Sequence, residues 1–413
     1  MINFSQLNED KGGKNLHLEH IEDEILNYGI TGGRASINFL QSLRDMLAGS
    51  ARSSVNMTVK WDGAPAIFAG IDPSDGKFFV AKKSVFNVSP KLYKTNAEID
   101  ADLSGALNDK FKVALSEFSK LGIKGVLQGD LMFTDDVSKE TIDGVSYYTF
   151  QPNTIVYAVP VDSSFGKIIN NAKIGVVWHT TYTGKELQDM KASFGANISG
   201  LRKPSTVWMD DATYKDTSGR STMTATETTK VTKSLSLAGS TFKKINSSML
   251  TKFLRLQDSM TGALAGASLK TYNNSKVRVG EKITNPKQHS QGYVKWVEMS
   301  IQKQIDKAKS DKGKAKYTNI QKEYMREVSK HVNNLTQIIT FQNHLVDGKM
   351  EIVKKLNSVK GLTDTFIKTS NGFKVVNPEG YVAIDRVSGG AVKLVDRMEF
   401  SFNNFTAIKA WDK

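Results

Sequence analysis

The segment Thr58-Val59-Lys60-Trp61-Asp62-Gly63-Ala64-Pro65 is the stretch from which the rest of the chain can be interpreted. Over residues 55–60, apolar and polar side chains alternate, which predicts a half-buried strand that ends at Lys60. The glycine and proline that follow predict a tight turn. A lysine in this position, two residues before a carboxylate, is a candidate nucleophile. Burial or nearby cations lower the pKa of such an amine, and the free amine can attack phosphorus.

An ordinary explanation of the same segment also exists. At average residue frequencies, a Lys-x-Asp-Gly tetrapeptide arises by chance in about one chain in ten of this length. Most chance matches are exposed turns with a solvated lysine. The segment alone therefore leaves both interpretations open, and the motifs found further along the chain are needed to choose between them.

The composition excludes several classes of protein. The chain has 413 residues, 39% of them apolar, which is enough for a large core and two or three structural units. It has no cysteine, so disulfides, thiolate zinc sites and cysteine nucleophiles are excluded. The N-terminus lacks a signal-peptide pattern and no run of 18 apolar residues occurs. We therefore expect a soluble protein of the cytoplasm, with no membrane segment.

The positive charge is concentrated in one part of the chain. Residues 242–360 contain 23 lysines and arginines against 9 acidic residues, which equals the whole net charge of +14. A localised basic surface is typical of a protein that binds a polyanion, most often nucleic acid. The alternative is that these lysines only solvate a helical surface.

The pattern along the chain predicts an α+β protein with an antiparallel sheet. Its expected parts, in order, are an N-terminal helical extension (1–50), the first part of a sheet core (51–204), an irregular Ser/Thr-rich linker (205–241), an all-α basic insert (242–371) and the last strands of the core (372–413). Because strand patterns resume after the helices, we expect the insert to interrupt one sheet domain.

Four further pieces accompany the Lys60 segment. They are Lys82-Lys83-Ser84, Gln128-Gly129-Asp130-Leu131, Glu379-Gly380-Tyr381-Val382 and Val392-Lys393-Leu394. In this order, and with these strand contexts and glycine positions, the set resembles the motifs of the covalent nucleotidyltransferases. That superfamily comprises ATP-dependent DNA and RNA ligases and mRNA capping enzymes. The resemblance covers the sheet core on both sides of the insert and implies an antiparallel-sheet nucleotidyltransferase core with an ATP-grasp-like ligase fold.

The resemblance also implies roles for individual residues. Lys60, with Asp62 and Lys393 as its catalytic partners, would attack the α-phosphate of ATP to form lysyl-AMP. Asp130 and Glu379 would bind the ribose hydroxyls or hold Mg²⁺ (or Mn²⁺). The full set implied to bind ATP is Lys60, Lys82, Lys83, Asp130, Tyr157, Glu379, Lys393 and Arg397. Tyr157 is the candidate for stacking on adenine. The ordinary alternatives are turn positions for Asp130 and Glu379, and a core position for Tyr157.

The chain departs from the family pattern at three places. Val395 stands where the family commonly has a second lysine, and Arg397 could supply that charge only from about 6–7 Å further along a strand. Lys82 or Lys83 replaces the arginine usual after the first motif. Asp130 replaces the commoner glutamate. A catalytically inactive relative that only binds nucleic acid therefore stays an alternative.

The expected substrate is a polynucleotide, with RNA preferred over DNA. Only 20 residues follow Lys393, too few for the C-terminal OB domain of DNA ligases and capping enzymes, so the resemblance is greatest to a divergent, phage-type RNA ligase. Lysines of the basic insert, such as Lys303, Lys307 and Lys314, would contact phosphates without reading sequence. A DNA nick-sealing ligase is the second hypothesis for the function, and an ordinary virion or scaffold protein is the third.

Overall fold

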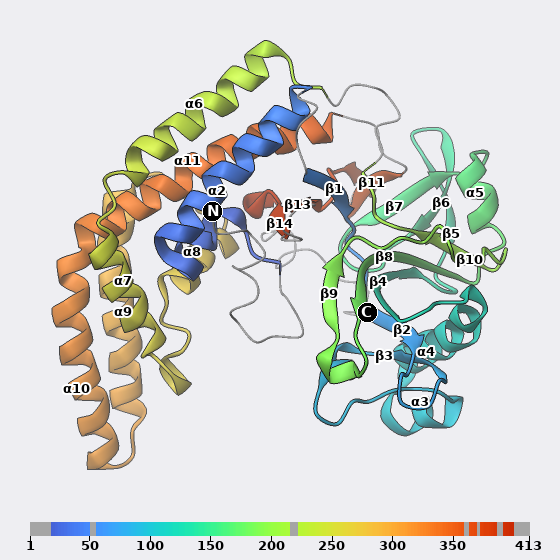
Figure 1. Ribbon diagram of the computed structural model, residues 1–413, viewed down its shortest axis with the longest axis horizontal. Helices are drawn as coiled ribbons and strands as arrows, with labels where there is room; N and C mark the ends of the chain where they lie inside the picture. The colour runs from blue at the N-terminus through green and yellow to red at the C-terminus, as the bar shows by residue number, and fades with distance from the viewer. Residues whose placement is uncertain are drawn as a thin grey trace.

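A computed structural model describes residues 18–49, 55–214, 222–358, 363–369, 372–385 and 391–399. Parts of the predicted N-terminal extension (1–17) and of the last core segment (400–413) lie outside these described residues. The described chain combines helices with mainly antiparallel strands, which confirms the α+β class. Long helices form an arm on one side of the molecule, and the sheets lie on the other (Figure 1).

Within the described residues, the strands form three sheets. The first has the order β1 (Val55–Lys60), β13 (Gly380–Asp385) and β14 (Ala391–Leu394). The second has the order β10 (Val207–Asp210), β8 (Ile174–Thr183), β4 (Val126–Phe133), β2 (Ala66–Ile71) and β3 (Phe78–Ala81), with β9 (Lys191–Phe194) beside β8. The third has the order β12 (Gly372–Val375), β11 (Asp364–Thr369), β7 (Val156–Pro160), β6 (Val145–Phe150) and β5 (Ser138–Ile142). In the second sheet, β10 and β8 run parallel.

The helices divide between the two sides of the molecule. Three short ones belong to the sheet region: α3 (Asn96–Asp102), α4 (Gly105–Phe118) and α5 (Ser164–Ile169). The others form the arm: α2 (Glu24–Leu47), α6 (Ala225–Phe242), α7 (Ser247–Asp258), α8 (Leu269–Arg278), α9 (Pro286–Lys307), α10 (Asp311–Val328) and α11 (Val332–Asn357). Among the helices of the described ranges, none has the length and apolar character needed to cross a membrane.

The strands that follow the arm pair with strands that precede it. β13 is antiparallel to β1, and β11 is antiparallel to β7. The arm therefore interrupts the sheet region along the chain. β11 lies within the segment expected to be all-helical (242–371), so that expectation is corrected at its C-terminal end.

The expectation of an irregular linker over 205–241 is also wrong, because this segment contains β10 and most of α6. Thr224 caps α6 and forms a capping box with Glu227. Val231, Leu235 and Ala238 are buried in the core of the arm at helical spacing. The many threonines hid this helix from sequence analysis because they have low helix propensity. Tertiary packing of one apolar face outweighs that preference.

The three-stranded sheet has two faces of different character. In an antiparallel pair, directly opposite residues share a face, and so do residues two apart along one strand. One face packs against the helical arm through Met57, Tyr381, Ala383, Val392 and Leu394. The register therefore places the other set, Thr58, Lys60, Val382, Ile384 and Lys393, on the opposite face. This second face points away from the arm and towards the second sheet.

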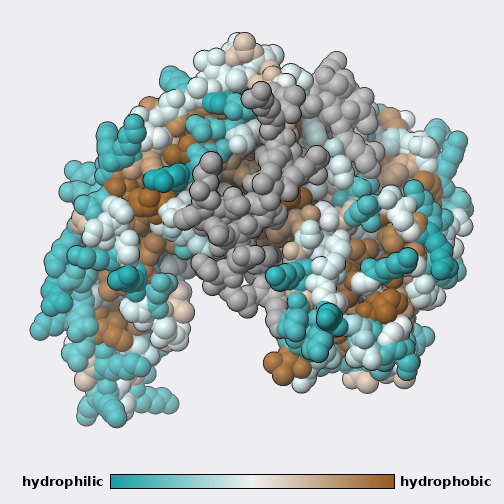
Figure 2. Space-filling model, viewed as in Figure 1, coloured by the Kyte–Doolittle hydropathy of each residue, from teal (hydrophilic) through white to brown (hydrophobic). Residues whose placement is uncertain are grey.

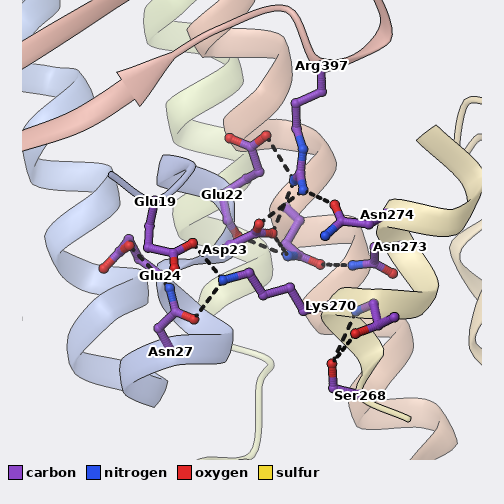
Figure 3. Close-up of polar contacts among 12 residues, drawn as sticks. Glu19, Glu22, Asp23, Glu24, Asn27, Ser268, Lys270, Asn273, Asn274 and Arg397 are labelled. Atoms are coloured by element: carbon purple, nitrogen blue, oxygen red, sulfur yellow. Dashed lines mark hydrogen bonds and ion pairs between the residues drawn. The ribbon is translucent and has the colours of Figure 1, made fainter. Parts of the chain in front are cut away.

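A buried cluster of charges joins the arm to the sheet region (Figure 3). Glu22 lies in a short 3-10 helix (Ile21–Asp23), and its carboxylate accepts hydrogen bonds from Lys349 of α11 at 2.9 and 3.0 Å. Arg397, which follows β14, contacts Glu22 at 3.3 Å and Asp23 at 3.1 Å. Burial alone would raise the pKa of Glu22, but Lys349 and Arg397 together lower it to about 2. Three distant segments of the chain therefore meet at one set of ion pairs.

Replacing Lys349 with methionine should lower the free energy of unfolding at neutral pH by about 3 kcal/mol, because the charge of Glu22 stays buried with only Arg397 as its partner. Urea unfolding of both proteins measures the difference. Lys354→Met, at an exposed position of the same helix, is the matched control. Equal stability of the two variants would contradict an energetic role for the cluster.

The same pair predicts a pH dependence. The folded-state pKa of Glu22 lies below its ordinary value of 4.5, at about 2. The stabilisation is therefore complete above about pH 5 and is lost as the pH falls through the folded-state pKa. The stability difference between wild type and Lys349→Met should shrink as urea unfolding is repeated from pH 7 down to pH 3. A constant difference would show that Glu22 is not the group involved.

Candidate functional site

A cavity of about 220 Å³ lies between the three-stranded sheet and the second sheet. From β1, the residue after it, β13 and β14, its walls receive Thr58, Val59, Lys60, Trp61, Val382, Ile384 and Lys393. From β4, β8 and β9 they receive Gln128, Asp130, Val177, His179, Thr180, Tyr182, Ala192 and Phe194. Leu18, Lys83 and Ala212 complete the lining. Charged groups of both signs thus share one cavity with aromatic and aliphatic side chains.

Lys60 is positioned by the pairing of β1 with β13. It is the last residue of β1 and lies opposite Gly380. Glu379 immediately precedes that glycine, and its carboxylate forms an ion pair with the Lys60 ammonium. Gly380 has a φ of +146°, and a Cβ there would lie 2.7 Å from the carbonyl oxygen of Leu394. Any other residue at position 380 would therefore push β13 away from β14 and move the partner of Lys60.

The turn after Lys60 is held by Asp62. The side chain of this residue is buried and accepts hydrogen bonds from Asn153 Nδ2 at 2.7 Å and from the backbone N–H groups of Thr154 at 2.8 Å and Ile155 at 3.0 Å. A Cβ on Gly63 would lie 2.4 Å from Cβ of Asp130. The turn therefore lies directly against β4. Asp62 does not line the cavity and acts by orienting the segment that carries Lys60.

Tyr157 is a core residue in this structure. Its ring centroid lies 4.9 Å from that of Trp61, and its hydroxyl accepts a hydrogen bond from the Asp62 backbone N–H at 2.6 Å. The side chain is only 2% exposed and is not part of the cavity wall. The expectation that Tyr157 stacks on adenine is therefore corrected. The ring packs against Trp61 in the core and holds the turn through the Asp62 backbone.

Two lysines with opposite pKa shifts face the cavity. Burial favours the neutral amine of Lys60, but the carboxylates of Glu379, Asp130 and Asp62 outweigh burial and raise the pKa of Lys60. Burial, followed by the positive charge of Lys60, lowers the pKa of Lys393. Lys393 lies opposite Val382, which in turn lies opposite Thr58, two residues before Lys60. The structure thus brings together Lys60, Glu379 and Lys393, as the motifs predict.

Asp130 and His179 form the opposite wall. Asp130 Oδ2 lies 3.7 Å from His179 Nε2, and His179 Nδ1 lies 2.8 Å from the Thr180 hydroxyl. The register between β4 and β8 shifts between Gln128 and Gly129, so His179 has no partner in the ladder. Such a bulge turns an additional side chain towards one face of a sheet. Sequence analysis missed His179 because the alternation of a strand gives no sign of a bulge.

The remaining basic candidates divide between the cavity and its surroundings. Lys83 lines the cavity. Lys82 instead pairs with Asp102 at 3.2 Å, and it does not reach the cavity wall. Arg397 is held by Glu22 and Asp23 in the buried charge cluster, so the expectation that it compensates for Val395 is corrected. Val395 itself is buried in an apolar core.

The three lysines expected to bind nucleic acid lie on the arm. Lys303 and Lys307 are exposed on α9, and Lys314 is exposed on α10. Neither helix contributes to the cavity wall. Figure 2 shows hydrophilic side chains over the outer surface of this part of the arm. A polyanion on this surface would contact a region separate from the cavity.

The acidic residues of the cavity could supply few metal ligands. Within the described ranges, no group of three or more histidine or carboxylate side chains is placed to hold a metal ion. Asp130 and Glu379 both act on the charge of Lys60. Mg²⁺ is commonly bound by only one or two carboxylates, with the other ligands taken from water and substrate phosphates. These two residues fit that kind of site.

Comparison with known proteins gives a family but no activity. No curated protein and no solved structure matches the chain. One family model does match, over residues 15–409, and its description is "Family of unknown function (DUF6267)". This match spans nearly the whole chain, including both halves of the sheet region and the arm between them. The chain therefore belongs to the DUF6267 family.

Proposed function

We propose that this protein is an ATP-dependent polynucleotide ligase that works through a lysyl-AMP intermediate. One observation carries the proposal: Lys60 and Glu379, 319 residues apart in the chain, form an ion pair at a cavity that also contains Lys393 and Asp130. These residues come from four of the motifs that resemble those of the covalent nucleotidyltransferases. A chance Lys-x-Asp-Gly turn would have no reason to meet the other motifs in one cavity.

The first step of the proposed reaction forms a P–N bond between Lys60 Nζ and the α-phosphorus of ATP. The bond from that phosphorus to the bridging oxygen breaks, and its electron pair leaves with pyrophosphate. Lys60 must first lose a proton, and the carboxylate of Glu379 is in contact with the ammonium and can accept it. Lys393 and Lys83 would face the phosphate charge that accumulates on the leaving group.

The later steps use the same cavity. The 5′-phosphate of a polynucleotide would attack the lysyl-AMP phosphorus and release Lys60, and a 3′-hydroxyl would then attack the activated 5′-phosphate and release AMP. A divalent metal ion held between Asp130, Glu379 and the phosphates would neutralise charge when bound. The basic surface of the arm favours a polynucleotide as acceptor, and we propose RNA before DNA.

A second candidate function is a nucleic-acid-binding protein without transferase activity. The buried position of Val395 and the pairing of Arg397 with Glu22 and Asp23 favour it, because both remove a cation that the family commonly directs at the phosphates. The two candidates differ in whether nucleotide is consumed. The following experiments separate them.

Intact mass after incubation with ATP and Mg²⁺ tests the nucleophile. Wild type should gain one AMP, about 329 Da as a lysyl adduct, and Lys60→Ala should gain nothing. Lys82→Ala is the matched control, since Lys82 pairs with Asp102 outside the cavity, and it should be labelled like wild type. Labelling of Lys60→Ala would place the nucleophile elsewhere, and no labelling of wild type would favour the binding protein.

The pH dependence of labelling tests the role of Glu379. Because the carboxylates raise the pKa of Lys60, the fraction of free amine increases only towards alkaline pH. Replacing Glu379 with glutamine removes one of these charges, so the rising limb of the rate against pH should move to lower pH, with a smaller maximum rate. Initial rates between about pH 6 and pH 10 measure the shift. An unmoved limb would mean that Lys60 does not titrate in the rate-limiting step.

Charge reversal on the arm tests the polynucleotide surface. The triple variant Lys303→Glu, Lys307→Glu and Lys314→Glu should weaken RNA binding and reduce its salt dependence, by about 0.7 in the log–log slope for each lost single-strand phosphate contact. Self-labelling with ATP should not change. The matched control reverses the exposed Lys139, Lys167 and Lys185 of the sheet region, which changes the net charge equally. Equal loss of binding in both triples would mean that only net charge matters.

A further inference from the structure

The cavity has two ends, which the strand registers define. At one end Lys60 lies opposite Gly380, and Asp130 lies opposite Val177. The other end is formed by Gln128 and Ile384. Gln128 precedes Asp130 by two residues on β4, and Ile384 follows Gly380 by four residues on β13. Two residues of a strand span about 6–7 Å. The second end is thus separated from Lys60 by enough space for the ribose of a nucleotide whose α-phosphorus lies at Lys60.

The walls of this second end suit a planar ring. Phe194 pairs with Thr180, and Thr180 lies opposite Gln128, so Phe194 comes from the strand next to β8 at the same level. Phe194 and Leu18 pack against Ile384 from the three-stranded sheet. All of these side chains line the cavity. Apolar side chains therefore line the cavity beside Gln128.

One polar group at this end, the amide of Gln128, is held in a defined orientation. The Tyr182 hydroxyl donates a hydrogen bond to Gln128 Oε1 at 2.7 Å. The Tyr182 ring is 3% exposed and packs against Phe86, with ring centroids 4.5 Å apart, so the hydroxyl cannot follow a moving amide. Burial raises the pKa of Tyr182 to about 12, which keeps the hydroxyl protonated as a donor. The bond turns the amide oxygen towards Tyr182 and leaves one of its lone pairs available.

The Nε2 group of Gln128 has no acceptor among the residues that the structure describes. Gln128 also lines the cavity. The side chain therefore offers a ligand two N–H donors and, beside them, one free acceptor lone pair. A donor and an acceptor side by side form a pattern that a nucleobase edge can match.

We propose that Gln128, oriented by Tyr182, reads the base of the nucleotide and makes the site selective for adenine over guanine. This inference rests on the proposed function. Adenine presents its exocyclic amine, a donor, next to the acceptor N7, and this pair complements a glutamine amide. Guanine presents two acceptors, O6 and N7, on the corresponding edge, so its O6 would face the glutamine oxygen without a proton between them. Gln128 thus determines specificity and takes no part in bond formation.

The test compares self-labelling rates with ATP and with GTP, measured by intact mass. Wild type should prefer ATP. Gln128→Leu should reduce the ratio of the ATP rate to the GTP rate by about tenfold or more, since a bidentate base contact contributes about 1–3 kcal/mol of discrimination. Gln128→Lys, which offers donors only, should move the preference towards GTP. A gain in GTP use is a result that simple damage to the site would not produce.

Two further variants keep the test decisive. Tyr182→Phe preserves the ring and removes the hydroxyl, so the ratio should fall several-fold even if a Gln128 variant fails to fold. Tyr148→Phe, whose hydroxyl contacts Asn170 outside the cavity, should leave the ratio unchanged. Wild-type labelling with unchanged ratios in the Gln128 and Tyr182 variants would overturn the assignment of Gln128 alone. Absence of wild-type labelling with any nucleotide would overturn the proposed function and this inference with it.

Discussion

The pairing of β1 with β13 is the constraint on which the rest of the structure depends. It joins Val55–Lys60 to Gly380–Asp385 in register along both strands. The period of two along each strand then assigns every side chain to one of two faces. One face seals the core of the helical arm, and the other forms a wall of the cavity. A shift of β1 by one residue against β13 would turn over the side chains of β1 and bury Lys60 against the arm, away from Lys393. Fold and site are therefore specified by the same hydrogen bonds.

This pairing of strands that are distant in the sequence carries a cost in loop-closure entropy. Bringing the ends of a loop together costs more as the loop lengthens, although the increase is only logarithmic. The helical arm reduces the effective length because its own core orders most of the intervening chain. The buried cluster of Glu22, Lys349 and Arg397 then fixes the arm relative to β14. Buried ion pairs contribute little net stability, but a missing partner is strongly unfavourable. We therefore regard the cluster as a device that specifies one arrangement of arm and sheet.

The sequence predicted those parts of the site that depend on local pattern. Strand alternation indicated Lys60, and the resemblance to the covalent nucleotidyltransferase motifs indicated Glu379 and Lys393; the pairing of β1, β13 and β14 brings the three residues together. Predictions that depended on tertiary surroundings were less successful. Arg397 and Lys82 were assigned to the phosphates because they stand near positions where the resembled family has a basic residue, whereas each is held by a carboxylate that the sequence gives no reason to pair with it. His179 needed a β-bulge to enter the site. The helix α6 depends on one buried apolar stripe in a segment of low helix propensity.

Lys60 and Lys393 have opposite electrostatic environments within the cavity, and this asymmetry has a chemical consequence. Lys60 is surrounded by carboxylates and is held as an ammonium ion, while Lys393 is buried beside another cation, which disfavours its charge. A triphosphate entering the cavity would bring negative charge close to both. Its phosphates would stabilise the charged form of Lys393 and also that of Lys60. A charged Lys393 beside Lys60 would oppose that effect, and the proton of Lys60 would still have to pass to a base such as Glu379. Under the proposed function, the ion pair with Glu379 would keep Lys60 protonated, and therefore unreactive, until that transfer takes place.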